Sequence, residues 1–220
     1  MSYLRTFNLA NLLNLFINRQ IIMKLLTLLT SLIILFLPFE VASQSISEIK
    51  DRIKTEKIRN VEVTYDKFKD RAWISTKPVN LIPGLASLLA GIGEPGSGNE
   101  YPSTWNFSAL LAFSGEKLEG HQESITLRVT SYSRGWIFVR GDQTLYLLLD
   151  NEDRFELEPL DEENEIRSGG VIESKLYELT RDQLRKILDA KKVEVKLGTF
   201  SRPFNAELIR RLRAFDSLIP

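Results

Sequence analysis

Apolar and polar side chains alternate over several segments of the chain, which is the pattern of β-strands with one buried face. The alternation is most regular where Ile125, Leu127 and Val129 stand between polar residues. Charged or glycine-containing turns separate these segments. The segments in which we expect strands are 61–65, 71–76, 105–113, 125–130, 154–157, 171–179 and 193–197.

The stretch 130–153 predicts a hairpin at the centre of this pattern. Its two strands are expected at 136–139 and 144–149, with a tight turn at 140–143 between them. The run Leu145–Leu149 is the most apolar segment outside the N-terminus. We therefore expect it to be the central strand of the core, buried on both faces or nearly so.

The segment 158–170 is acidic and ends in two glycines, so we expect an exposed loop there. The segment 81–103 begins small and apolar and continues rich in Gly, Pro and Ser. Its second half is expected to be a loop. Its first half is interpreted as a short helix on the core, with a surface flap that meets a ligand or membrane as the alternative.

Two helices are predicted near the C-terminus. Thr180 with Gln183 forms a capping box before a helix at 181–190. Asn205 caps a last helix, in which Leu208, Leu212 and their neighbours form one apolar stripe. Near the other end, isoleucines in 46–58 recur at roughly helical spacing, which indicates either a short helix or a solvated leader.

Together these elements predict an α+β fold, an antiparallel β meander or sandwich with two C-terminal helices packed on it. We expect a single α+β domain over 61–220, preceded by a leader or short helix over 44–60.

Residues 1–43 are expected to form an export signal region that does not belong to this domain. The signal peptide is expected to start at Met23. Lys24 is its basic residue, and a mainly apolar segment of 13 residues follows. Small residues before Gln44 predict cleavage after Ser43. This places the chain in the periplasm or outside the cell. In the alternative, the apolar segment 21–39 is retained and anchors the protein in the membrane.

The amino-acid composition excludes several classes of function for this protein. The chain has 29 basic and 29 acidic residues, so it lacks the basic excess of a nucleic-acid-binding protein. It has no cysteine, which excludes disulfides, thiolate catalysis, cysteine-ligated zinc and lipid attachment through cysteine. With His121 as its single histidine, we expect no metal site and no cofactor.

Several short motifs are better explained without chemistry. The acidic tract 150–165 lacks the glycine and the terminal glutamate of a calcium loop. The glycines at 91–96 are not in a strand-to-helix context, and the Arg-Gly-Asp tripeptide at 140–142 fits a turn. A two-carboxylate hydrolase site stays possible, but no pair of carboxylates stands out.

The aromatic residues give the remaining functional candidates. Trp73, Trp105 and Trp136 are expected mainly in the sheet core, with a carbohydrate or peptide platform as the alternative. Tyr132, Arg134 and Trp136 lie at the mouth of the predicted hairpin. We therefore predict that these three residues form a binding rim.

The order of motifs over about 61–216 resembles that of uncharacterised exported bacterial, lipoprotein-like domains. The matching residues are Thr130-Ser131-Tyr132, Trp136-Ile137-Phe138, Leu147-Leu148-Leu149-Asp150, Glu173, Tyr177-Glu178-Leu179 and Ala190-Lys191-Lys192-Val193-Glu194-Val195. The resemblance implies an envelope location and a non-catalytic role. Lipid anchoring does not carry over, because the lipid-attachment cysteine is missing.

The expected function is that of an exported, non-enzymatic binding or structural module of the bacterial cell envelope. Its partner would be a protein, an envelope polymer or a small ligand, and not a nucleic acid; a membrane is involved only if the N-terminal segment is retained. Two alternatives stay open. One is a carboxylate-dependent hydrolase acting on an envelope polymer, and the other is a membrane-anchored subunit of an envelope complex.

Overall fold

The computed structural model describes residues 43–82, 102–120, 124–137, 143–150, 152–167 and 169–220. They belong to one compact unit, Val41–Pro220, and the unit Met1–Glu40 lies outside them. The export signal therefore lies outside the described residues, except for Ser43. The same holds for most of the segment 81–103, for His121 and for the Arg-Gly-Asp tripeptide.

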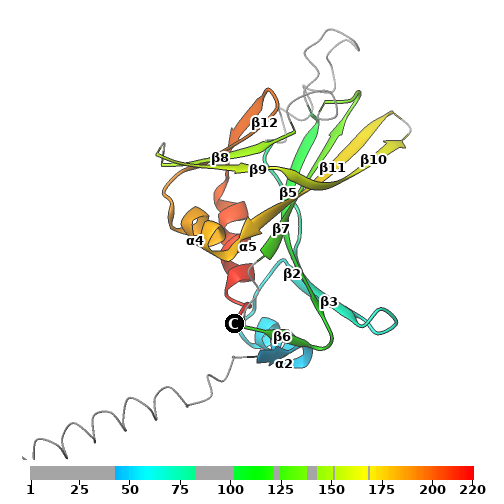
Figure 1. The fold of residues 1–220 in the computed structure, drawn as a ribbon, viewed down its shortest axis with the longest axis vertical. Coiled ribbons are helices and arrows are strands. Elements are labelled where there is room, and N and C mark those ends of the chain that lie inside the picture. Colours follow the sequence, from blue (N-terminus) through cyan, green and yellow to red (C-terminus); the bar gives the residue numbers. More distant parts are fainter. Residues whose placement is uncertain (1–42, 83–101, 121–123, 138–142, 151, 168) are drawn as a thin grey trace, which may run out of the picture. The chain divides into compact units, whose positions relative to one another are not determined.

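Three antiparallel sheets make up most of this unit (Figure 1). The largest has seven strands, with β10-β11-β7-β5-β3-β2 in that order and β4 paired to β5. Its strands are β2 (Val61–Asp66), β3 (Arg71–Thr76), β4 (Val79–Asn80), β5 (Thr104–Ser114), β7 (Ser124–Ser133), β10 (Pro159–Arg167) and β11 (Gly170–Thr180).

The second sheet has four strands in the order β13-β12-β8-β9. They are β8 (Leu145–Leu149), β9 (Asp153–Leu157), β12 (Val193–Leu197) and β13 (Phe200–Pro203). A third, two-stranded sheet joins β1 (Ser43–Ser45) to β6 (Lys117–Glu119).

Three helices complete the described fold: α2 (Ile46–Thr55), α4 (Arg181–Asp189) and α5 (Ala206–Asp216). Thr180 and Gln183 form the predicted capping box of α4, and the Asn205 side chain accepts a hydrogen bond from the Leu208 N–H at 2.8 Å. Residues 46–55 are helical, and Ile49 of α2 is completely buried. The helix interpretation of this segment is therefore correct, and the helix contributes to the core.

One cluster of buried apolar side chains connects both larger sheets with all three helices. In the seven-stranded sheet, alternate residues such as Ile74, Phe107 and Leu127 point into this cluster. In Figure 1, α4 and α5 (orange and red) lie beside the long strands β5, β7 and β11. The predicted α+β class with two C-terminal helices is confirmed. Among the described residues, we find no helix whose length and apolar character would let it span a membrane.

Three predictions about the region 136–170 were wrong. Trp136 and Ile137 are not in a strand, and 138–142 lie outside the described residues. β8 instead pairs with β12 and β9, in the four-stranded sheet. Its Tyr146 and Leu148 are only half-buried, so the strand buries one face and not both. The acidic segment 158–170 forms β10 and the start of β11, and not a loop.

Tyr65, which lies on β2 next to the β2–β3 turn, has an ionisation that can be tested. The Tyr65 hydroxyl donates a hydrogen bond to Asp70 Oδ1 at 2.8 Å. This bond, then burial and the Asp70 charge, raise the pKa of Tyr65 to about 12 from the ordinary 10.0. The folded-state pKa exceeds the unfolded one, so the stabilisation is complete below pH 10 and is lost as the pH rises towards 12.

We therefore expect a spectrophotometric titration of phenolate absorbance to include the late ionisation of Tyr65, near pH 12. In the Tyr65→Phe variant, the late absorbance change should be smaller by that of one tyrosine. Asp70→Asn should move the Tyr65 ionisation to lower pH, because the negative charge is removed while asparagine tolerates the positive φ of 46° at this position. A late absorbance change of the same size in Tyr65→Phe would contradict the assignment.

Candidate functional site

The three residues of the predicted binding rim lie on β7 and in the irregular segment that follows it. Tyr132 lies on β7, on the sheet face opposite the core, and is half-buried. A Cβ atom at Gly170 would lie 2.9 Å from two atoms of the Tyr132 ring, so the start of β11 packs directly on that ring. Arg134 is exposed and Trp136 is half-buried in the irregular segment after β7.

This irregular segment leads to the other face of the sheet. The backbone N–H of Ile137 donates to Glu173 Oε2 at 2.8 Å, and Glu173 is completely buried on the core face of β11. None of the three predicted rim residues lines either of the two hollows of the surface that are considered below. Their role in ligand binding stays a prediction.

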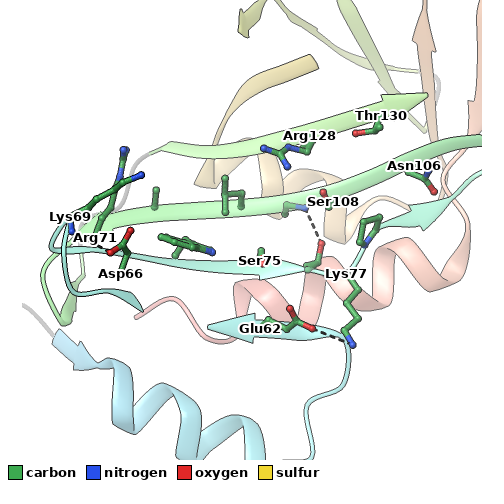
Figure 2. A pocket seen from close by; sticks show the side chains of 16 residues that line it. Glu62, Asp66, Lys69, Arg71, Ser75, Lys77, Asn106, Ser108, Arg128 and Thr130 are labelled. Atoms are coloured by element: carbon green, nitrogen blue, oxygen red, sulfur yellow. Dashed lines mark hydrogen bonds and ion pairs between the residues drawn. The ribbon is translucent and has the colours of Figure 1, made fainter. Parts of the chain in front are cut away.

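The larger hollow is an open groove of about 690 Å³ on the seven-stranded sheet (Figure 2). It lies on the face opposite the core. The strand residues that line it alternate with buried residues, and alternate residues of a strand point to opposite faces. The strand residues that line this face are Arg71, Trp73 and Ser75 of β3, Asn106, Ser108, Leu110 and Ala112 of β5, and Arg128 and Thr130 of β7.

Strand register explains why these residues lie together. Trp73 pairs with Ala112, and Ser75 pairs with Leu110. Arg128 pairs with Ser108 on the other side of β5. Directly paired residues of antiparallel strands share a face, so three neighbouring strands present their outward residues to one surface. Small side chains on the central strand leave the space that the larger ones border.

One side-chain hydrogen bond connects β3 and β5 at the end of this surface. The pairing of the two strands ends at Ser75, and the Thr76 hydroxyl accepts the next hydrogen bond, from the Ala109 N–H at 2.9 Å. This bond is one of the dashed lines in Figure 2. The neighbouring β4 then continues the pairing with β5 at Phe107. The face therefore stays continuous where the regular pairing of β3 stops.

The groove carries more basic than acidic side chains. Four basic residues line it, against the two acidic residues Glu62 and Asp66. Lys77 pairs with Glu62 at 3.2 Å, and Asp66 Oδ1 accepts the backbone N–H groups of Phe68 and Lys69 in the turn. The other basic residues are Lys69, Arg71 and Arg128. In the part of the chain that the structure describes, their side chains make no hydrogen bond or ion pair, so these charges are available to a ligand.

A second, smaller hollow of about 410 Å³ lies on the four-stranded sheet. Two of its three charged groups, Arg154 and Glu194, already have partners within the chain, and only Lys196 makes no ion pair among the described residues. Arg154 lies over the Tyr146 ring at 4.7 Å and pairs with Glu156 at 2.7 Å. Glu194 accepts a hydrogen bond from the Ser201 hydroxyl at 2.8 Å. The first groove is therefore the better candidate for ligand binding.

Comparison with protein-family models, with curated proteins and with solved structures finds no match to this chain. The site is therefore interpreted from its own residues alone. Over the described ranges, no group of three or more His, Cys, Asp or Glu residues is placed to hold a metal ion.

The placement of the tryptophans was only partly predicted. Trp105 is buried in the core as expected, with 1% of its surface exposed. Trp73 is half-buried on the open face instead, since its neighbours Ala72 and Ile74 both point into the core. The groove residues Arg71, Ser108 and Arg128 were missed. Their alternation with apolar residues was the available signal, but a single strand does not reveal which outward faces come together.

Proposed function

We propose that this chain is an exported, non-enzymatic binding module of the bacterial cell envelope, and that the groove on the seven-stranded sheet is its ligand-binding surface. The export part rests on the signal-like sequence that starts at Met23. The binding part rests on one observation, a hollowed sheet face that presents three basic side chains that make no ion pair among the described residues. A cleft with a few convergent polar groups is the usual form of a binding site.

The groove supports binding better than two-carboxylate hydrolysis. Its acidic residues, Glu62 and Asp66, stand four positions apart on β2. At the rise of a strand, this separation is about 13 Å between backbone positions. Glycosidases hold their two carboxyl groups at roughly 5–10 Å, on either side of the bond that is cleaved. Both carboxylates also have partners within the chain already.

Binding of envelope polymers by the purified mature protein tests this proposal. Ser108 lies at the middle of the groove, so Ser108→Trp should fill the groove and weaken binding at least about tenfold. The control, Glu156→Trp, places the same side chain on an exposed position of the four-stranded sheet and should bind as the unchanged protein does. Binding that is equal in all three proteins, or absent from the unchanged protein, would contradict the proposal.

Location is tested separately by N-terminal sequencing of the protein recovered from its native cells. We expect the mature chain to begin at Gln44. A mature chain that retains 21–39 would instead favour the membrane-anchored alternative.

We further propose that the two larger sheets are the layers of a β-sandwich. Their inward side chains belong to one buried cluster. The Tyr177 hydroxyl of β11 donates to the Gln143 carbonyl, just before β8, at 2.9 Å. Nuclear Overhauser contacts are expected between inward side chains of the two sheets, and their absence would contradict this arrangement.

A further inference from the structure

The position of the groove on the face of a sheet limits how a ligand can be recognised. The backbone N–H and C=O groups of β3, β5 and β7 are paired with one another across the groove floor. A bound peptide strand needs an unpaired sheet edge for its main-chain hydrogen bonds. A ligand on the floor formed by these three strands must therefore be recognised by side chains, which disfavours a peptide added there as a further strand.

The neutral side chains of the groove suit a ligand with many hydroxyl groups. Ser75, Ser108, Asn106 and Thr130 carry hydroxyl or amide groups that both donate and accept hydrogen bonds. Trp73 adds a flat, half-buried aromatic ring, and its cross-strand neighbour Ala112 is too small to cover that ring. A flat apolar ring beside hydrogen-bonding groups matches a sugar, which has an apolar C–H face and a rim of hydroxyls.

The basic side chains of the groove indicate that the ligand is negatively charged. The Arg71 and Arg128 guanidinium groups make no ion pair in the described part of the chain, although Asp66 is the cross-strand neighbour of Arg71, and both arginines are exposed. A guanidinium group binds a carboxylate through two parallel hydrogen bonds, which makes arginine well suited to acidic ligands. The ligand should therefore carry anionic groups, and carboxylates fit this geometry.

The spacing of these arginines indicates a long ligand. Arg71 pairs with Ser114 of β5, and Arg128 pairs with Ser108, six positions away on the same strand. The two arginines are therefore separated by about 20 Å along the strands. Trp73 and Ser75 lie between them in register. A single sugar cannot contact both arginines, whereas an extended chain can.

We propose that the groove binds an acidic polysaccharide, with Arg71 and Arg128 holding carboxylates of separate sugar units and the Trp73 ring stacking on a sugar between them. This inference rests on the proposed function and specifies its ligand.

Calorimetric titration with polygalacturonate tests the inference. Fully methyl-esterified polygalacturonate has the same sugar chain without the charge, and it should bind at least about tenfold more weakly. The doubly substituted Arg71→Gln, Arg128→Gln protein should also lose at least about tenfold in affinity for the charged polymer, because two charge-assisted contacts are removed. The matched control, Arg154→Gln with Lys196→Gln on the four-stranded sheet, should bind as the unchanged protein does.

Other outcomes would overturn the inference. They are equal binding of the esterified polymer, no binding of polygalacturonate, binding of galacturonic acid as tight as that of the polymer, or tighter binding of polyglutamate, which would indicate an acidic peptide. If a neutral envelope polymer binds and Ser108→Trp abolishes that binding, the inference of an acidic ligand is wrong, whereas the proposed function still holds. If no envelope polymer depends on the groove, both fail.

Discussion

Replacing Phe107 with alanine should lower the free energy of unfolding by about 3–5 kcal/mol, the range typical for removing a buried phenylalanine ring. Phe107 is completely buried on the core face of β5. Its ring makes edge contacts with Trp105 and Phe204, at centroid distances of 5.1 and 5.5 Å. The ring thus links the seven-stranded sheet to the segment just before α5.

Urea unfolding followed by circular dichroism measures this loss. Phe68→Ala is the matched control, because the Phe68 ring is 89% exposed in the β2–β3 turn. It should change stability by no more than about 0.5 kcal/mol. Similar losses from the two substitutions would mean that Phe107 does not occupy the core position described.

Substitution of Lys175 gives the second large expected effect on the free energy of unfolding. The size of this effect depends on which residue replaces the lysine. Its side chain is 1% exposed on the core face of β11 and pairs at 2.8 Å with Glu162 of β10, which is 45% exposed. Glu173, two positions earlier on the same face, is also buried. Lys175→Glu would place a third carboxylate here, and we expect it to cost at least about 3 kcal/mol, as for other broken buried ion pairs.

Lys175→Met should instead stay within about 1 kcal/mol of the unchanged protein. Methionine has a similar length and needs no partner, and it removes the cost of keeping an ammonium group away from water. The same urea measurement serves here, with Lys77→Met as the control, since Lys77 makes its ion pair at the surface. A methionine variant as unstable as the glutamate variant would show that the ion pair itself stabilises the fold.

The elements that sequence reasoning located best are those whose local pattern agrees with their packing. The segment 71–76 was predicted with the bounds of β3, and Thr180 with Gln183 was predicted as the cap of α4. In both cases short-range spacing decides the structure. A capping box needs residues three apart, and a half-buried strand needs residues two apart.

β10 was missed because its residues show no such spacing. Eight of its nine residues are exposed, so neither the odd-numbered nor the even-numbered residues form an apolar face. Its composition is that of a solvated loop, and its structure comes from backbone pairing with β11, which composition does not report. The hairpin predicted around 140–143 failed for the opposite reason. Leu145–Leu149 has a strong strand pattern, but the pattern does not name its partners, which are β9 and β12.

The groove could be predicted only in its parts. Trp73 was assigned to the core because large aromatic rings are usually buried, yet the smaller Ala72 and Ile74 take the inward positions of β3. Register with β5 then places Trp73 beside Ala112, and register with β7 brings in Arg128. These pairings connect residues far apart in the chain, and a single sequence contains no direct record of them.

The acidic residues of β10 have a consequence for self-association. The strand order of the largest sheet ends at β10, whose exposed residues include Asp161, Glu162, Glu163 and Glu165. If two molecules met edge to edge there, rows of like charge would lie at the strand spacing of about 4.8 Å. Such repulsion opposes the addition of another strand. The acidic composition of β10, which led us to predict a loop, therefore also protects this edge of the sheet against aggregation.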